Sequence, residues 1–271
     1  MVEDRRITNS EEEFIPSEEF INTAKTLIEE AQKEGIILRV IGALAIRIHS
    51  TPEMAELHKK LGRFAGKKQE FTDIDFVGLS KQRKKVRKFL ESRGWKFDAY
   101  MFMFASGMTS RNRHIYRGRI DIDVFFDEVD ACHKIPLKDR LLIDPITISL
   151  TDLLLTKLQI VEFSEKDAKD VIVLLRGHQI GEEDAPETIN AKYIAKLLAD
   201  DWGFWYTATT NLKKLKEGCR NFKELSEEDI QDVVNKIDLL LKYIDEEPKT
   251  KKWKKRAKIG TKKKWYKEVR L

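Results

Sequence analysis

Thr72-Asp73-Ile74-Asp75-Phe76-Val77-Gly78 alternates carboxylates with apolar residues and ends at a glycine. Side chains of a β-strand alternate between its two faces, so the pattern predicts a strand with Asp73 and Asp75 on one face and Ile74 and Phe76 in a core. Like charges held this close repel each other unless a cation lies between them, and carboxylate oxygens suit a hard metal such as Mg²⁺. The alternative is an ordinary half-exposed strand with two solvated aspartates, because Asp-x-Asp is a short motif.

A second acidic strand is predicted from Arg119 to Asp127, where acid again alternates with hydrophobe. Asp121 and Asp123 would share one face of this strand, with Ile122 and Val124 on the other. Either aspartate could supply a third carboxylate beside the first pair. Upstream of this strand, the predictions are a strand at Phe97 to Phe104, a polar loop at residues 106–112 that could act as a lid, and a turn at residues 117–118.

The apolar segment from Ile36 to Ile41 predicts a short strand that runs directly into a helix beginning near Gly42. Small residues at Gly42 and Ala43 would let the backbone come close to a ligand, and the free amides of the first helical turn would face an anion. The alternative is a plain connection between a strand and a helix.

Helical patterns dominate after Pro145. Ser149 and Ser164 are each followed three residues later by an aspartate, which is the form of a capping box at a helix start. Further helical stretches follow at residues 190–199, 202–215 and 226–244. We therefore expect two domains and a tail, with bounds at residues 1–145, 146–248 and 249–271.

The excess positive charge lies at one end of the chain. The formal net charge is +5, and residues 249–270 hold twelve Lys or Arg and one Glu, a local +11, which leaves −6 for residues 1–248. Trp253, Trp265 and Tyr266 lie among these lysines, a composition that suits phosphate attraction with base stacking. The alternative is a solvated, partly frayed terminal segment.

Several classes of protein are disfavoured by the rest of the composition. No apolar run is long enough for a membrane span and no signal-peptide pattern is present, so we expect a cytoplasmic protein without membrane contact. Cys132 and Cys219 lie far apart without a metal-ligand spacing, so neither a zinc site nor a disulfide framework is indicated.

Together these features meet the requirements of metal-dependent nucleotidyl transfer. Paired carboxylates can hold Mg²⁺ (or Mn²⁺) against a triphosphate, and the amides of a helix N-terminus can bind phosphate oxygens. A third carboxylate can complete a second metal's ligand set or help to take the proton of the attacking hydroxyl.

The ordered motifs also resemble a known family. They are Val40-Ile41-Gly42-Ala43-Leu44-Ala45, Thr72-Asp73-Ile74-Asp75-Phe76, Ile122-Asp123-Val124-Phe125, Asp152-Leu153-Leu154-Leu155-Thr156-Lys157-Leu158-Gln159 and Lys166-Asp167-Ala168-Lys169-Asp170. In this order they resemble the AbiEii/AbiGii-type nucleotidyltransferases of the DNA polymerase β-like superfamily, over roughly residues 36 to 176. The resemblance implies an α+β fold, in which a nucleotidyltransferase core with a mixed β-sheet flanked by helices precedes an α-helical C-terminal domain.

The resemblance also implies roles for individual residues. Asp73, Asp75 and Asp123 would bind metal and act in catalysis, with Asp123 preferred over Asp121 because Asp-Val-Phe matches the family strand better. The remaining implied residues would bind the nucleotide; they are Gly42, Ala43, Lys157, Asp167 and Asp170. The family turn usually reads Gly-Gly or Gly-Ser, so Ala43 removes a hydroxyl contact but keeps its backbone amide.

Two functions are therefore open at this point. The first is an enzyme that moves a nucleoside monophosphate from an NTP to a hydroxyl and releases pyrophosphate; some relatives of this type are toxins that modify tRNA and are checked by a cognate antitoxin, which implies an RNA or tRNA acceptor and an antitoxin partner. The second is a non-catalytic protein that keeps the nucleotidyltransferase fold and binds nucleotide or RNA.

Overall fold

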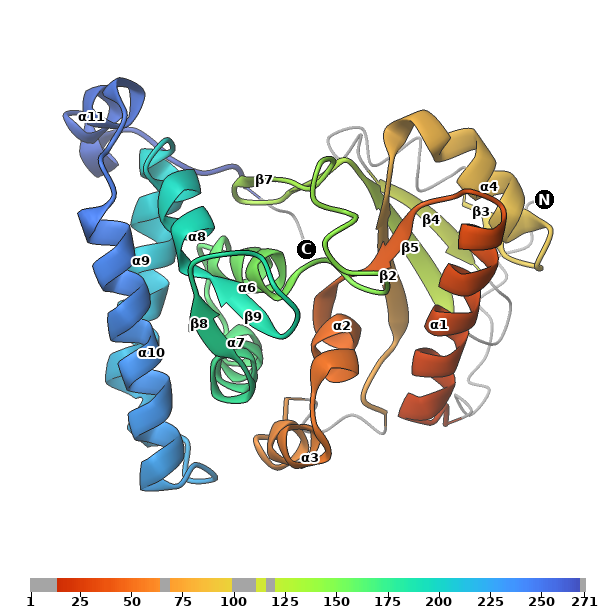
Figure 1. Cartoon of the computed structure of the whole chain (residues 1–271), viewed down its shortest axis with the longest axis horizontal. Coiled ribbons are helices and arrows are strands. Elements are labelled where there is room, and N and C mark those ends of the chain that lie inside the picture. The colour runs from red at the N-terminus through yellow and green to blue at the C-terminus, as the bar shows by residue number, and fades with distance from the viewer. Residues whose placement is uncertain (1–13, 64–68, 99–110, 116–119, 269–271) are drawn as a thin grey trace, which may run out of the picture.

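The structure is a computed structural model that describes residues 14–63, 69–98, 111–115 and 120–268. The predicted lid loop lies almost wholly outside these residues, as does most of the strand predicted at Phe97 to Phe104. The turn predicted at residues 117–118 lies outside them as well. Figure 1 shows a sheet with helices at one end of the molecule and a group of helices at the other.

The N-terminal part alternates helices and strands. Its elements are α1 (Ser17–Lys33), β1 (Leu38–Val40), α2 (Gly42–His49), α3 (Pro52–Lys60), β2 (Asp73–Gly78), η1 (Ser80–Gln82), α4 (Arg83–Glu91), β3 (Lys96–Phe97), β4 (Arg111–Ile115), β5 (Asp121–Phe126), β6 (Glu128–Asp130) and β7 (Lys134–Pro136). Their strands form one mixed sheet in the order β1-β2-β5-β4-β3, with β6 and β7 attached to β5. Within it β2 and β5 run parallel, whereas β1 and β4 are antiparallel to these neighbours.

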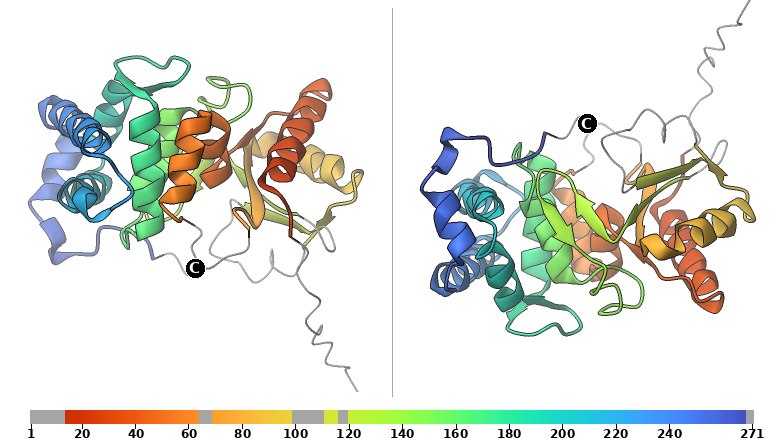
Figure 2. Two further views of the ribbon diagram at one scale, coloured as in Figure 1. Left: turned by 90° about the horizontal axis from the view of Figure 1, so that it is seen from below. Right: turned by 90° about the horizontal axis from the view of Figure 1, so that it is seen from above.

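The C-terminal part is mostly helical. Its elements are α6 (Leu150–Leu158), α7 (Glu165–Gly177), β8 (Gln179–Gly181), β9 (Thr188–Asn190), α8 (Ala191–Leu198), α9 (Trp202–Gly218), η2 (Cys219–Asn221), α10 (Glu227–Glu246), α11 (Lys251–Ala257) and η3 (Gly260–Lys262). The predicted α+β class is therefore confirmed, and both views of Figure 2 show α1 and α4 beside the sheet, at the end away from α9 and α10.

Side-chain caps begin several of these helices, as their sequences predict. Ser149 accepts a hydrogen bond from the Asp152 amide at the start of α6. Ser164 and Asp167 form a complete capping box at α7, where each side chain accepts from the other's backbone amide.

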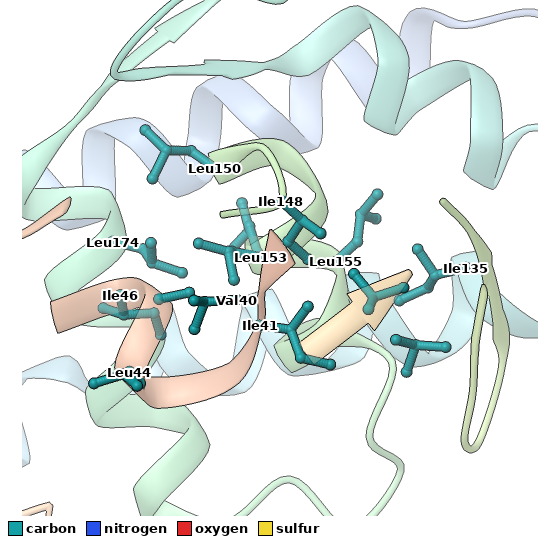
Figure 3. Packing of buried hydrophobic residues seen from close by; sticks show 14 of the residues in the cluster. Val40, Ile41, Leu44, Ile46, Ile135, Ile148, Leu150, Leu153, Leu155 and Leu174 are labelled. Atoms are coloured by element: carbon teal, nitrogen blue, oxygen red, sulfur yellow. The ribbon is translucent and has the colours of Figure 1, made fainter. Parts of the chain in front are cut away.

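One buried apolar cluster runs through both parts of the chain. Val40 and Ile41 of the β1–α2 connection pack with Leu153 and Leu155 of α6 (Figure 3), and all four are buried. The segment after β7 also joins the sheet edge, because Val40 accepts from the Ile148 amide and donates to the Ile146 carbonyl. The β1 edge of the sheet is therefore held against α6. The predicted domain bounds stay a prediction.

The described part of the basic tail, residues 249–268, folds against α9. The ring of Trp253 lies edge-on to Trp205 at a centroid distance of 5.0 Å, and the ring of Trp265 lies edge-on to Tyr206 at 5.1 Å. The tail tryptophans are thus used in internal packing, and the tail is not a frayed segment over its described length. None of the helices in the described part of the chain is long and apolar enough to cross a membrane.

Candidate functional site

Parallel pairing of β2 with β5 brings the predicted acidic residues together. The register places Asp73 opposite Asp121 and Asp75 opposite Asp123. One carboxylate oxygen from each of Asp73, Asp75 and Asp123 lies within 4.8 Å of the others. Asp121 is not in this group, so the geometry favours Asp123 as the third carboxylate.

The donor set of this carboxylate group fits a hard divalent cation. Asp123 is only 4% exposed, whereas Asp73 and Asp75 are half-buried and open toward a cavity. Three converging carboxylates without a nitrogen or sulfur ligand favour Mg²⁺ or Mn²⁺ over zinc. Burial makes the mutual repulsion of these charges costly unless a cation offsets it.

The first turn of α2 lies directly beside the carboxylates. Gly42 has a φ of +75°, a conformation that favours glycine. A Cβ atom added to Gly42 would lie 3.3 Å from Asp75 Oδ2, so the close approach also requires a residue without a side chain. The Ile41 amide donates to the Asp75 carbonyl at 2.9 Å, which fixes the turn to β2.

That turn is available to a ligand. No side chain caps the N-terminus of α2, because its N-cap residue is Ile41. The first amides of a helix have no partner within the helix, so those of Gly42 and Ala43 can donate to an anion.

Two of the three carboxylates, the α2 turn and several cations line one cavity of about 230 Å³, whereas Asp123 is not among the described residues that line it. Its lining residues are Ile41, Gly42, Ala43, Leu44, Arg63, Phe71, Thr72, Asp73, Asp75, Lys157 and Lys166. The predicted residues Asp73, Asp75, Gly42, Ala43 and Lys157 are thus brought together. Anion-binding groups face a metal-binding group across a space small enough for both to contact one ligand.

Asp170 lies behind this cavity and is fully buried. Its Oδ1 accepts from His58 Nε2 at 2.8 Å and from Arg63 Nε at 2.5 Å, and its Oδ2 pairs with Lys157 Nζ at 2.7 Å. Burial raises the pKa of Asp170, but Lys157, His58 and Arg63 outweigh it and hold this pKa well below its usual range. Asp170 therefore positions two of the cations that line the cavity.

Asp167, which the resemblance assigns to nucleotide binding, takes part in the capping box of α7. Its carboxylate accepts from the Ser164 hydroxyl at 2.6 Å in the α7 capping box. Asp167 is not among the described residues that line the cavity. A role in nucleotide binding stays a prediction for this residue.

Two charged residues of the cavity lining, Arg63 and Lys166, were not predicted as site residues from the sequence. Arg63 follows α3 in a polar stretch that carries no motif, so no sequence signal marked it. Lys166 stands in the Lys166-Asp167-Ala168-Lys169-Asp170 motif and could have been found there, since it is exposed at the first turn of α7.

Comparisons with known proteins give a distant structural similarity. No protein-family model and no curated protein matches the chain. Among solved structures, the chain is similar to the antibiotic-resistance factor ANT(2'')-Ia. The similarity covers 58% of this chain and 83% of that chain, with 10% sequence identity and a TM-score of 0.35. A likeness this distant carries no argument about function, and the resemblance to the AbiEii/AbiGii-type family stays a prediction.

Proposed function

We propose that the protein is a metal-dependent nucleotidyltransferase that moves a nucleoside monophosphate from an NTP to a hydroxyl acceptor and releases pyrophosphate. The observation that carries this proposal is the cavity lined by Asp73, Asp75, the uncapped first turn of α2 and three cations, with Asp123 completing the carboxylate group next to it. The three cations are Arg63, Lys157 and Lys166. A purely structural acidic strand would not need a helix N-terminus and three cations around it.

Asp73, Asp75 and Asp123 would hold one or two Mg²⁺ or Mn²⁺ ions. A bound ion of this kind offsets the charge on the triphosphate in the transition state. The Asp123 carboxylate would also take the proton of the attacking hydroxyl, as the bond from that oxygen to the α-phosphorus forms and the bond to pyrophosphate breaks.

The α2 turn and the cations would bind the phosphates. The Gly42 and Ala43 amides donate to phosphate oxygens, while Lys157 and Arg63 supply positive charge to the leaving pyrophosphate. Because Asp170 bonds both of these cations, they need little reorganisation when the nucleotide binds.

RNA is the acceptor class that the charge distribution supports. Six exposed lysines of the tail make no ion pair with any described residue; they are Lys251, Lys254, Lys255, Lys258, Lys262 and Lys263. An uncompensated cluster of this kind attracts a phosphate backbone. The toxin-like role and the antitoxin partner implied by the resemblance stay predictions, as does the cytoplasmic location.

The test is an incubation of the purified protein with Mg²⁺, total RNA and each of the four α-labelled NTPs. We expect label to enter RNA with the parent protein and to fall by about 100-fold or more with Asp75→Asn, because even outer-shell residues of metal sites are worth about 10–100-fold. Circular dichroism checks that the variant is folded. Equal transfer by the parent and the variant would contradict the proposal, and NTP binding without any transfer would favour a non-catalytic nucleotidyltransferase fold.

A matched pair of variants tests the third carboxylate. Asp123→Asn should abolish transfer as Asp75→Asn does, whereas Asp121→Asn should keep most of it, because only Asp123 belongs to the carboxylate group. Both residues lie on β5 two positions apart, so a general weakening of the strand would affect both variants alike. Loss of transfer in Asp121→Asn alone would reverse the assignment.

A further inference from the structure

A second and larger cavity lies on the helical side of the molecule. Its volume is about 470 Å³, roughly twice that of the carboxylate cavity, and the two cavities share no lining residue. Its walls are the first turn of α7, the last turn of α9 and the segment through η2 that follows α9. This volume is in the range of small-ligand sites.

The lining combines aromatic surface with positive charge. Phe163 and Phe222 are half-buried and present ring surface to the cavity. Lys214 and Lys223 are exposed at its rim and make no ion pair with a described residue. Glu224 is an exposed acidic residue of the same rim.

The other charged residues of the lining compensate each other. Lys169 Nζ lies 2.5 Å from Glu165 Oε1 and also donates to the Gly62 carbonyl at 3.3 Å. The charges that remain to interact with a ligand are therefore those of Lys214, Lys223 and Glu224. Two positive charges against one negative charge favour an anionic ligand.

We propose that this cavity binds a nucleotide unit, with the base against Phe163 and Phe222 and the phosphate between Lys214 and Lys223. Aromatic side chains accept the face of any base, and lysines supply point charges for a phosphate. The proposal does not rest on the transfer reaction, since binding here requires neither the metal nor turnover. The nucleotide unit could be a free nucleoside monophosphate or the end of a nucleic-acid strand, which share this chemistry.

An occupant of this cavity would also be coupled to the carboxylate cavity. Lys169 bonds the Gly62 carbonyl, and the next residue, Arg63, lines the carboxylate cavity. Arg63 is itself bonded to Asp170, the residue after Lys169. A ligand that moves Lys169 would therefore act on Gly62 and, through it, on Arg63 in the lining of the carboxylate cavity.

Equilibrium dialysis of labelled AMP against the full-length protein in EDTA tests the site, because chelation leaves the carboxylate group without a cation. We expect saturable binding of one AMP that weakens at least tenfold in Gly218→Leu. Gly218 lines the cavity and has an ordinary helical φ of −87°, and an added Cβ would meet only Asn221 Nδ2 at 3.8 Å, so a larger side chain can fill the space without backbone strain.

Charge variants locate the phosphate. The double variant Lys214→Gln, Lys223→Gln should weaken AMP binding about fivefold or more and reduce its salt dependence. Lys213→Gln removes a neighbouring exposed lysine of α9 that does not line the cavity, and should leave binding unchanged. Two results would overturn the proposal. Loss of AMP binding in Lys166→Gln, with normal binding in Gly218→Leu, would place AMP in the carboxylate cavity. Absence of binding by both AMP and a 5′-phosphorylated trinucleotide would show that this cavity does not bind nucleotides.

Two further measurements complete the test. A 5′-phosphorylated trinucleotide that binds tenfold tighter than AMP would identify a strand end as the occupant, whereas equal affinity would identify the free nucleotide. Saturating AMP should change the affinity for Mg–ATP at least threefold in the parent and not in Gly218→Leu, by the reciprocity of linked sites. An unchanged affinity in the parent would overturn the coupling.

Discussion

The central contact of the proposed active site, at the scale of single residues, is between Gly42 and Asp75. The glycine adopts a left-handed φ and lies where any Cβ would reach the Asp75 carboxylate. Two independent constraints thus demand glycine at one position, whereas the neighbouring Ala43 has neither. The AbiEii/AbiGii-type turn usually has Gly or Ser where this chain has Ala43. This difference is compatible with the proposed function, which uses only the backbone amide of Ala43 to bind phosphate.

Gly42→Ala tests this contact against a matched control, Gly35→Ala. Both positions have a positive φ, +75° and +67°, so each substitution should cost about 1–2 kcal/mol of unfolding free energy. Only Gly42 has a neighbour within 4 Å, Asp75 Oδ2 at 3.3 Å, while an added Cβ at Gly35 meets nothing. We expect transfer activity to fall at least tenfold in Gly42→Ala and to persist in Gly35→Ala. Urea unfolding and the labelled-NTP assay measure the two effects, and equal activities would refute the steric role.

At the scale of elements, the β6–β7 hairpin connects the sheet to the helical part. His133 in its turn stacks on Phe204 of α9 with a ring-centroid distance of 5.0 Å and an interplanar angle of 5°. Its Nε2 lies 2.9 Å from Thr207 Oγ1, and its backbone amide donates to Gln159 Oε1 at 3.2 Å. Burial lowers the pKa of His133 to about 4, and the charge of Asp201 opposes this shift only in part.

This lowered pKa predicts how stability depends on pH. Between about pH 6.5 and 4 the unfolded chain binds a proton at His133 that the folded chain does not, so stability is full above pH 6.5 and falls as the pH drops. From pH 7 to pH 5 the loss should be about 2 kcal/mol for this residue. Urea unfolding at both pH values should show a smaller loss in His133→Gln. Burial also lowers the pKa of His178 to about 4, so part of the pH dependence of stability should remain in His133→Gln. An equal loss of stability in the parent and the variant would contradict the role of His133.

At the scale of the whole molecule, the basic tail links the last helix back to the sheet side. After its tryptophans pack on α9, the Lys267 amide donates to the Cys132 carbonyl in the β6–β7 turn at 3.0 Å. Gly203 of α9 allows the tail to approach, because an added Cβ would lie 2.5 Å from the Trp265 carbonyl oxygen. The lysines of the tail therefore project from a fixed surface, which lowers the entropy cost of binding a polyanion.

A double-mutant comparison tests whether the tail is packed. Removing residues 249–271 should lower the unfolding free energy by about 3 kcal/mol, since two partly buried tryptophans are lost. Gly203→Ala should destabilise the full-length chain, because the tail backbone must move away. In the truncated chain the same change should be neutral or stabilise by up to about 1 kcal/mol, as alanine favours a helix. Urea unfolding of the four proteins measures this, and equal effects of Gly203→Ala in both backgrounds would show that the tail does not pack there.

Local chemistry was readable from the residue order. Strand alternation predicts that Asp73 and Asp75 share a face, and serine caps predict the starts of α6 and α7, because these features depend on neighbours a few residues apart. The antiparallel pair β6–β7 and the parallel pair β8–β9 are not predicted from the sequence, since strands of three residues are too short to show a period.

Long-range pairing could not be read in this way. The pairing of β2 with β5 places both Asp121 and Asp123 opposite an aspartate of β2, and the distances between carboxylate oxygens group only Asp123 with Asp73 and Asp75. Three basic residues contact Asp170 from distant positions in the sequence. His58 and Arg63 precede it by 112 and 107 residues, and Lys157 precedes it by 13 residues. The sequence of the tail is equally ambiguous, because it does not determine whether the tail tryptophans face solvent or pack on α9. Side-chain periodicity determines which residues share a face, whereas packing of distant segments determines which faces meet, and that second step placed the cations opposite the carboxylates.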